Sequence, residues 1–189
     1  MEAAKRIIRY VKGTINLGLW YPFETSANLA GYCRITGYTD ADWAGCEEDR
    51  KSTSGGCFYF GNCLIGWHCK KQTCISLSTG EAEYVAAGSG CTQMLWLKYM
   101  LADYGISQGT MTLFCDNTST IDISKNPVQH SRTKHIDIRH HFIRELVDDK
   151  VIALEYIDTH NQKADILTKP LDTKRYYFLR AAIGMLSSS

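Results

Sequence analysis

The spacing of apolar and polar side chains changes along the chain, and each change predicts an element. Apolar side chains recur at helical spacing over residues 2–12, up to Gly13, and a short extended stretch, LGLWYP, follows. From Gly31 the period falls to two, which predicts three strands, in YCRITGYTD, GGCFYFGN and CLIGWHCKKQ. The last two meet near Gly61 and Asn62, as the strands of an antiparallel hairpin do.

Helical spacing returns after Ser76. Residues 79–104 predict a long helix that ends before Gly105, and MTLFCDN then predicts a buried strand. The stripe by which this helix packs is expected at five positions: Val85, Ser89, Thr92, Trp96 and Tyr99. The chain thus reaches its fourth strand through a helix, as a parallel crossover requires.

Three more helices and one strand are predicted beyond this point. Residues 118–125 predict a short helix and residues 135–150 a long one, whose packed positions are Ile136, His140, Ile143 and Val147. IALEYIDT is the fifth strand. Residues 162–169 are expected to be helical as far as Pro170, and TKRYYFLRAAIGML predicts a closing amphipathic helix.

This order of elements is that of an α/β protein. The first three strands form an antiparallel meander, and the fourth and fifth are parallel strands reached through helices. We therefore expect a five-stranded mixed sheet flanked by helices. Sites in such sheets favour the carboxyl ends of strands, so reactive side chains at those ends are the first candidates.

The composition is that of one ordinary globular domain. The chain has 189 residues, 44% of them hydrophobic and 22% charged, which is enough to bury a core without covalent cross-links. No stretch approaches the roughly 20 apolar residues of a membrane span. The first dozen residues are basic and amphipathic, unlike a signal peptide. We expect an intracellular protein with no membrane partner.

Eight cysteines are spread between Cys33 and Cys115 without a Cys-x-x-Cys pair. Reduced, mostly packed thiols fit this spread better than a disulfide framework does. The alternative is a zinc site drawn from His68 and four cysteines: Cys57, Cys63, Cys69 and Cys74. Wide spacings and positions within predicted strands favour packing over zinc.

Acidic side chains gather at the predicted strand ends. Asp40 closes the first strand of the meander and Asp116 follows the fourth strand, so both reach the same edge of the sheet. Of the two glutamates that begin the long helix, Glu81 fits a capping box with Ser78, which gives it a structural role. Glu83 points about 200° away from Glu81 around the helix and is the better candidate for a site.

Asp165 is the fourth candidate acid. It falls in the first turn of a helix after the fifth strand, where the helix dipole favours an acid in any case. The four acids together indicate a site more strongly than Asp165 does alone. They come from four elements and are expected at one end of one sheet: Asp40, Glu83, Asp116 and Asp165. Four buried carboxylates this close require a divalent metal ion to offset their charge.

Seven motifs in fixed order carry a family resemblance. GYTDADWAG, DRKSTSGG, KKQ, LSTGEAEYVAA, CDNTSTI, KHIDIRHHFIRE and QKADILTKPL resemble the ribonuclease H domain of copia-type (Ty1/copia) retrotransposon polyproteins. KRIIRYVKGT and LGLWYP resemble the end of the reverse transcriptase part of these polyproteins, and FLRAAIGM resembles their C-terminal tail. The resemblance implies three parts: residues 1–30 as a reverse transcriptase remnant, 31–172 as the ribonuclease H domain and 173–189 as a helical tail.

The resemblance implies the ribonuclease H fold and cleavage of the RNA strand of an RNA·DNA hybrid. The implied cofactor is two Mg2+ ions, with Mn2+ as a substitute, and the catalytic and metal-binding acids carry over to Asp40, Glu83, Asp116 and Asp165. Asp40 is implied to bridge both ions, Asp165 to serve the side of the attacking water, and Glu83 with Asp116 the leaving-group side. Asp42 is a further neighbour. Two ions about 3.5 to 4 Å apart suit in-line cleavage of a phosphodiester.

The implied partners are the hybrid and a reverse transcriptase domain of the parent polyprotein, in a cytoplasmic particle or the nucleus. Relatives in the wider superfamily place a mobile histidine shortly before the last acid, where it helps protons or product to leave. In this chain that histidine would be His160, and an exposed loop histidine is the alternative. His135, His140 and His141 are expected to serve packing or a phosphate-facing surface and not to bind metal.

Basic and hydroxyl side chains near the first acid are candidates for substrate binding. The net charge is only +1, so the chain must bind nucleic acid through local basic and polar side chains and not through its overall charge. Gly55 and Gly56 permit close backbone approach to a phosphate, although a plain polar loop is the alternative. The candidate substrate contacts are Arg50, Lys51, Ser52, Thr53, Ser54, Lys70, Lys71, Gln72 and Asn117.

Two functions stay open on the sequence. The first is an active metal-dependent ribonuclease H, an endonuclease that hydrolyses phosphodiesters. The second is a catalytically silent nucleic-acid-binding or scaffold module derived from such a domain. The complete set of acids favours the first.

Overall fold

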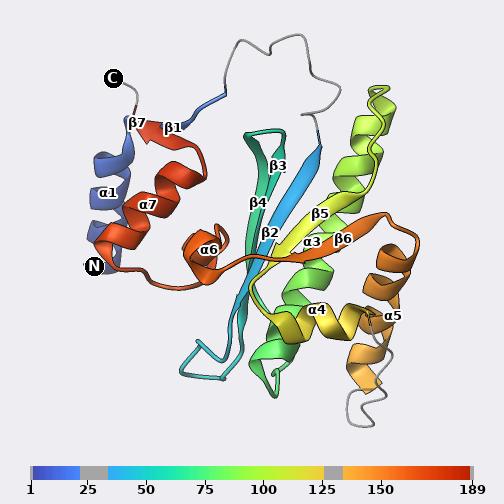
Figure 1. The fold of residues 1–189 in the computed structure, drawn as a ribbon. Coiled ribbons are helices and arrows are strands. Elements are labelled where there is room, and N and C mark those ends of the chain that lie inside the picture. Colours follow the sequence, from blue (N-terminus) through green and yellow to red (C-terminus); the bar gives the residue numbers. More distant parts are fainter. Residues whose placement is uncertain (1, 22–33, 126–133, 188–189) are drawn as a thin grey trace.

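The computed structural model describes residues 2–21, 34–125 and 134–187. A five-stranded mixed sheet in the order β4-β3-β2-β5-β6 forms its centre (Figure 1). Its strands are β2 (Ile35–Asp42), β3 (Thr53–Phe60), β4 (Cys63–Lys71), β5 (Met111–Cys115) and β6 (Ile152–Tyr156). The first three pair antiparallel, and β5 runs parallel to both β2 and β6. The predicted meander with two added parallel strands is confirmed.

Three helices cover one face of this sheet (Figure 1): α3 (Thr79–Asp103), α4 (Thr118–Lys125) and α5 (Lys134–Asp148). Between them and the strands lies the main apolar core, which includes Ile35, Phe58, Tyr84, Met94, Leu113, Ile143 and Ile152. α3 approaches β2 closely at Gly90, where an added Cβ would lie 2.5 Å from Thr39 Cγ2. A glycine is therefore needed at this contact for steric reasons.

The predicted packing stripe of α3 is confirmed only at Val85, which is buried, whereas Ser89 is half-buried and Thr92 is exposed. Trp96 and Tyr99 are 58% and 65% exposed. The buried side is formed by Ala87, Cys91, Met94, Leu97 and Leu101. Tyr84 of the same helix is 1% exposed and belongs to the same core, so the predicted stripe fails in its direction around the helix and not because aromatic rings are excluded. In α5, Ile143 is fully buried as predicted, whereas Ile136 and His140 lie outside the residues whose side chains are described.

The two ends of the described chain meet on the other side of the sheet (Figure 1). β1 (Leu17–Leu19) and β7 (Met185–Ser187) form a two-stranded antiparallel sheet of their own. Around it, Leu19, Ile183 and Met185 belong to a second apolar cluster with Cys57, Tyr59 and Leu64 of the central sheet. α1 (Glu2–Thr14) lies beside α7 (Thr173–Ala182) and has no buried residue. The division of the chain at residues 30 and 172 stays a prediction, and the β1–β7 pair links its first and last parts.

Three predicted helices have different bounds. The first continues through Gly13 to Thr14. The helix expected over 162–169 is one turn, α6 (Asp165–Thr168), preceded by a 3-10 turn, η1 (Thr159–Asn161). Pro170 explains its end, because the residue before a proline is driven to extended backbone. The closing helix stops at Ala182, and Gly184, with φ +82°, turns the chain into β7.

No helix within the described part of the chain is long and apolar enough to cross a membrane. The seven described cysteines are all free, and Cys57, Cys91 and Cys115 among them are buried. Within the described ranges, the groups of side chains that are close enough to share a metal ion are formed by acids and Cys115, and none contains His68. The zinc alternative therefore has no geometric support.

Candidate functional site

The site is built at the edge where β2 and β5 end side by side. These two strands are parallel neighbours, so Asp40, near the end of β2, and Asp116, just after β5, reach the same place. Asp165 joins them as the first residue of α6. Ligand oxygens of these three carboxylates all lie within 4.8 Å of one another. The structure thus brings together three of the four predicted acids, two of them by the strand-end geometry that the sequence indicated and the third, Asp165, from α6.

Glu83 completes the set from α3. Its Oε1 accepts a hydrogen bond from the Ala41 amide at 3.1 Å, which fixes it against the end of β2. Asp116, Glu83 and Cys115 form a second group with ligand atoms within 4.8 Å. Asp116 is therefore common to both groups, whereas the family resemblance assigned the shared position to Asp40.

Glu81 has the structural role that distinguishes it from Glu83. The Ser78 hydroxyl accepts from the Glu81 amide at 3.2 Å, which is the expected N-cap. The Glu81 carboxylate accepts from the Leu77 amide at 2.6 Å, one residue before the predicted Ser78 amide. Both bonds lie at the start of the helix, so Glu81 is used in capping and Glu83 is free to face inward.

Burial and mutual repulsion dominate the electrostatics of the acids. Asp40, Asp165 and Glu83 are only 1%, 3% and 6% exposed. Burial, followed by the charges of Asp40 and Asp116, raises the pKa of Glu83 to about 9. Burial also raises the pKa of Asp40, although a hydrogen bond from Thr168 and the charge of Lys169 oppose the rise. The cluster therefore holds its negative charge at a cost that a cation would reduce.

Two cations of the chain itself contact the acids. Lys169 Nζ lies 2.9 Å from Asp165 Oδ1 and 3.4 Å from Asp40 Oδ1. Arg175 of α7 places Nη2 3.2 Å from Asp165 Oδ2. The Thr168 hydroxyl donates to Asp40. We did not predict these residues, although the spacing of four between Asp165 and Lys169 is one that brings side chains together on a helix.

The donor set fits a divalent ion with a preference for oxygen. Mg2+ is bound in proteins by carboxylates, and Asp40, Glu83, Asp116 and Asp165 supply them at one place. Cys115 does not fit such an ion, because burial, followed by the charge of Glu83, raises the pKa of its thiol and keeps it protonated. Asp42 lies against Gly45, so closely that a Cβ there would overlap its carboxylate. It belongs to neither of the two groups found in the described residues.

A loop beside the acids carries His160. Thr159 donates to Asp116 Oδ2 at 3.0 Å, and Arg175 donates to the backbone oxygens of Thr159, at 2.6 Å, and His160. The His160 ring packs against Phe178 of α7, with 4.9 Å between ring centroids. The histidine is therefore held by the tail helix in this structure, and its catalytic role stays a prediction. His141 is exposed, and the side chains of His135 and His140 lie outside the described residues.

Three of the expected substrate contacts are engaged inside the protein. Ser52, Ser54 and Gln72 are buried. The Gln72 amide group donates to Ser54 Oγ at 2.9 Å and to the Ala82 carbonyl at 3.0 Å, and Ser52 Oγ accepts from the Ala44 amide at 3.1 Å. These bonds tie β3, β4 and the start of α3 together. These bonds give the three residues a structural role, and their contact with phosphate stays a prediction.

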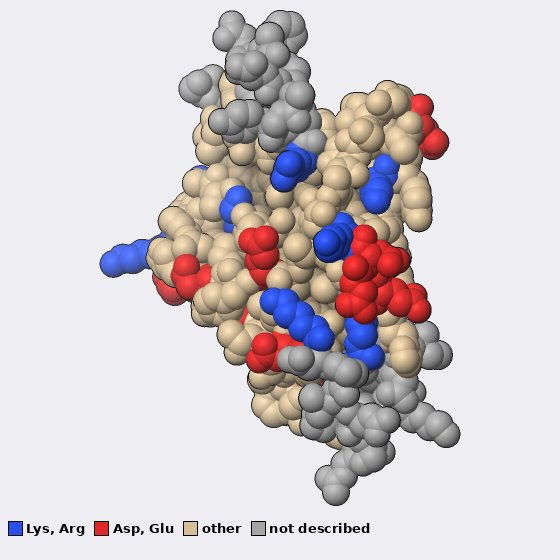
Figure 2. All heavy atoms as spheres, turned by 45° about the vertical axis from the view of Figure 1, so that its right-hand side comes forward, with Lys and Arg blue, Asp and Glu red and all other residues tan. Residues whose placement is uncertain are grey.

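The other expected contacts lie nearer the surface. Lys71 Nζ is 2.9 Å from Asp49 Oδ1 and 3.0 Å from Cys46 Sγ, and Lys51 Nζ is 3.6 Å from Asp49 Oδ2. Asn117 caps α4 by accepting from the Thr120 amide at 3.2 Å. The remaining three are exposed or half-buried: Arg50, Thr53 and Lys70. Figure 2 shows acidic and basic side chains interspersed on one face, in keeping with the small net charge.

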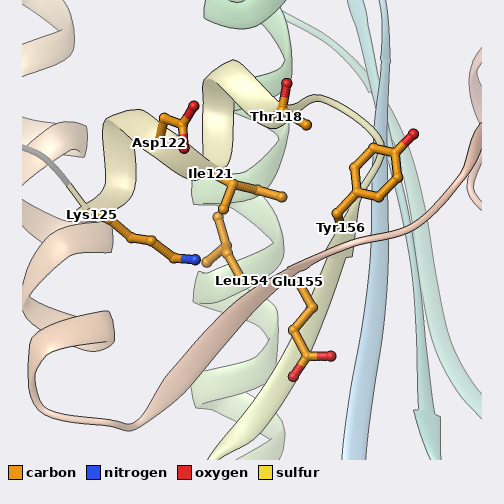
Figure 3. Close-up of a pocket in the computed structure, with 7 residues that line it drawn as sticks. All are labelled: Thr118, Ile121, Asp122, Lys125, Leu154, Glu155 and Tyr156. Carbon is orange, nitrogen blue, oxygen red and sulfur yellow. The ribbon is translucent and has the colours of Figure 1, made fainter.

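A shallow pocket of about 400 Å³ lies between α4 and β6 (Figure 3). Its lining consists of Thr118, Ile121, Asp122, Lys125, Leu154, Glu155 and Tyr156. None of the four acids of the cluster lines it. The candidate site is therefore the acid cluster and not this pocket.

A mixed sheet of this order, with acids from β2, from α3, from just after β5 and from α6 at one edge, defines a ribonuclease H-fold domain. Solved structures agree. The N-terminal RNase H domain of a Mycobacterium tuberculosis protein, solved as a fusion with maltose-binding protein, matches with a TM-score of 0.53 at 11% identity, over 79% of this chain and 98% of that one. LC11-RNase H1 in complex with an RNA/DNA hybrid matches with a TM-score of 0.51 at 14% identity, over 71% and 94%.

Sequence relatives narrow the class. The chain is 42% identical over 187 residues to the retrovirus-related Pol polyprotein from transposon TNT 1-94 of Nicotiana tabacum, and 37% identical over 186 residues to that from transposon RE1 of Arabidopsis thaliana. These alignments cover 99% and 98% of this chain but only 14% and 12% of the polyproteins. No family model matches the chain. From its sequence relatives and its fold together, the chain corresponds to the ribonuclease H segment of copia-type Pol polyproteins.

Proposed function

We propose that this chain is a metal-dependent ribonuclease H that cleaves the RNA strand of an RNA·DNA hybrid during retrotransposon reverse transcription. One observation carries the proposal: four carboxylates from four separate elements converge at one sheet edge, where they repel one another. Bringing these acids together destabilises the folded state, and such clusters of buried acids are typical of functional sites. The location that follows is a cytoplasmic particle or the nucleus, with a reverse transcriptase domain as a partner.

Asp40, Glu83, Asp116 and Asp165 would hold the ions, with Mg2+ as the expected metal and Mn2+ as a substitute. When bound, two such ions activate the attacking water and stabilise the leaving oxygen of the phosphodiester. The chain itself orients the ligands. The Ala41 amide positions Glu83, Thr168 positions Asp40, and Thr159 positions Asp116. Each bond removes freedom from a carboxylate before substrate arrives, which is the protein's part in such a site.

The substrate assignment draws on the class of the fold. LC11-RNase H1, which shares that fold, was solved with an RNA/DNA hybrid. In this chain the basic and hydroxyl candidates that are not buried, and so are open to its phosphates, are Arg50, Lys51, Thr53, Lys70 and Lys71. Asp49 pairs with two of these lysines, so a phosphate would have to compete with it.

A silent binding or scaffold module is the second candidate. The contacts of Lys169 and Arg175 with the acids favour it, because cations of the chain already offset part of the charge that metal would neutralise. With these two cations to offset the charge of the acids, a domain could keep the acids although it no longer cleaves nucleic acid.

Cleavage of a labelled hybrid separates the two candidates. The RNA strand should be cut in Mg2+ or Mn2+, with no cutting of duplex DNA or duplex RNA. Asp116→Asn should abolish cleavage because Asp116 lies close both to Glu83 and to the pair Asp40 and Asp165. Cutting that persists in excess chelator would exclude the mechanism. Binding of the hybrid without cleavage, in both metals, would support the silent module.

A further inference from the structure

Lys169 occupies an unusual position for a lysine beside a metal-binding cluster. Its ammonium contacts one oxygen of Asp165 and one of Asp40, at 2.9 and 3.4 Å. These are two of the three carboxylates whose oxygens lie within 4.8 Å of one another. Both acids are almost fully buried, whereas the lysine side chain is about a third exposed. The ammonium therefore approaches the cluster from the solvent side.

The backbone around Lys169 holds it at this place. Its amide donates to the Asp165 carbonyl at 3.3 Å, which closes the single turn of α6 and brings residue 169 back beside residue 165. Pro170 follows, and Lys169 has the extended backbone, φ −137° and ψ 152°, that a residue before proline adopts. The anchor is fixed, while the four-carbon side chain keeps the freedom to swing outward.

We propose that Lys169 is an internal counter-ion of the acid cluster, which stabilises Asp40 and Asp165 without metal and competes with the divalent ion that these two carboxylates bind. The proposal rests on the proposed function only in taking the cluster as the metal site. Two cations cannot share the same carboxylate oxygens at close range without strong repulsion. Metal binding therefore displaces the ammonium, and the lysine sets how much metal is needed to load the site.

The charge state of the lysine agrees with this role. Burial alone would lower the pKa of Lys169, but the carboxylates of Asp40 and Asp165 more than offset that effect and raise it above the ordinary value. Arg175 does not replace the lysine, because its guanidinium contacts the other oxygen of Asp165 and two backbone carbonyls. Among the described residues, Lys169 is the cation that joins Asp40 to Asp165.

Metal affinity and stability should move in opposite directions when Lys169 is changed. In Lys169→Met, Mn2+ titrated into the metal-free full chain should bind about ten- to a hundred-fold more tightly, because one positive charge near the ion is removed. The melting temperature in chelator should fall, because two buried carboxylates lose their shared partner. Lys174→Met removes the same charge from an exposed position on α7 and should change neither value.

The outcomes separate this inference from the proposed function. Equal Mn2+ affinity in wild type and Lys169→Met would overturn the inference while leaving the metal site intact. No Mn2+ binding at millimolar concentration in any variant would overturn both.

A measurement on the wild-type chain serves if Lys169→Met does not fold. Acylation of lysines by an amine-reactive ester, read by mass spectrometry, should label Lys169 slowly in chelator and faster in saturating Mg2+, with Lys174 as the internal reference. Unchanged or slower labelling of Lys169 in Mg2+ would overturn the proposal.

Discussion

At the scale of single residues, two glutamates two positions apart on one helix have opposite roles. Glu81 is bonded to the backbone at the start of α3, and Glu83 to the Ala41 amide inside the acid cluster. The difference in role comes from the groups around each side chain, since both residues are glutamates in the first turns of the same helix. The pair therefore provides a variant and its control within one element.

Glu83→Gln should lower hybrid cleavage by orders of magnitude, because it keeps the shape but removes a negative charge from the metal site. Its fold should be retained, since the glutamine oxygen can still accept from the Ala41 amide and crowding among the acids is relieved. Glu81→Gln still accepts at the helix start, so its stability should change by less than about 1 kcal/mol and its cleavage should stay near wild type. Cleavage rates and urea denaturation of both variants measure this. An inactive Glu81→Gln beside an active Glu83→Gln would contradict the assignment.

The same residue predicts how stability depends on pH without metal. The folded-state pKa of Glu83, about 9, lies above the ordinary 4.5, so between these values the folded chain holds a proton that the unfolded chain releases. The free energy of unfolding in chelator should therefore fall as pH rises from 5 to 9. The slope for one group is at most about 1.4 kcal/mol per pH unit. Urea denaturation at several pH values should show a shallower fall in Glu83→Gln. A wild-type stability that rises through this window would refute the prediction.

At the scale of elements, the site depends on how closely α3 lies on β2. The close approach of α3 to β2 brings Glu83 to the Ala41 amide. Two turns further along α3, Gly90 permits this approach because it has no side chain to meet Thr39. The helix is thus positioned by the absence of a side chain as much as by its apolar residues.

Gly90→Ala should destabilise the chain by about 1 to 3 kcal/mol, because the added methyl group meets Thr39 in a packed core. This loss should exceed the gain of about 1 kcal/mol that alanine brings to a helix. Gly13→Ala in α1 is the control, since nothing lies within 4 Å of its Cβ position, and it should not lower stability. Thermal and urea unfolding measure both. A Gly90→Ala protein more stable than wild type would mean that α3 can move off the sheet at little cost.

Patterns in the sequence predicted those elements that alternate or repeat clearly. Period two and the turn at Gly61 predicted the hairpin of β3 and β4, and strand-end logic predicted that Asp40 and Asp116 would meet. The stripe of α3 failed beyond Val85 because the buried face also includes glycines, Gly88 and Gly90, which a hydrophobic pattern does not mark as packed. β7 has only three residues, too few for a period to be visible. Arg175 was missed because its partners lie on η1 and α6, so only the tertiary fold shows the contact.

At the scale of the whole molecule, the fold is held by packing and hydrogen bonds. All seven described cysteines are free, and three of them lie in the cores on both sides of the sheet or beside the acids. The thiols therefore act as small apolar side chains.

Reducing agent should leave the melting temperature unchanged, because none of the seven described cysteines forms a disulfide. Thiol titration of the denatured chain, without prior reduction, should find all eight cysteines reactive. A melting temperature that falls sharply on reduction, with fewer reactive thiols, would instead mean that disulfides stabilise the fold.

The pairing of β1 with β7 determines how the domain responds to force. Leu17 lies opposite Ser187, and Leu19 opposite Met185, so the chain enters β1 and leaves β7 at the same end of this small sheet. Tension between the two ends therefore loads its hydrogen bonds one after another, as in a zipper, and not all at once in shear. Behind β7 comes α7, whose Arg175 holds Asp165 and the carbonyls of Thr159 and His160. A pull on both ends would open the tail first and so release η1 and Asp165 of α6 before it strained β2, the strand that carries Asp40.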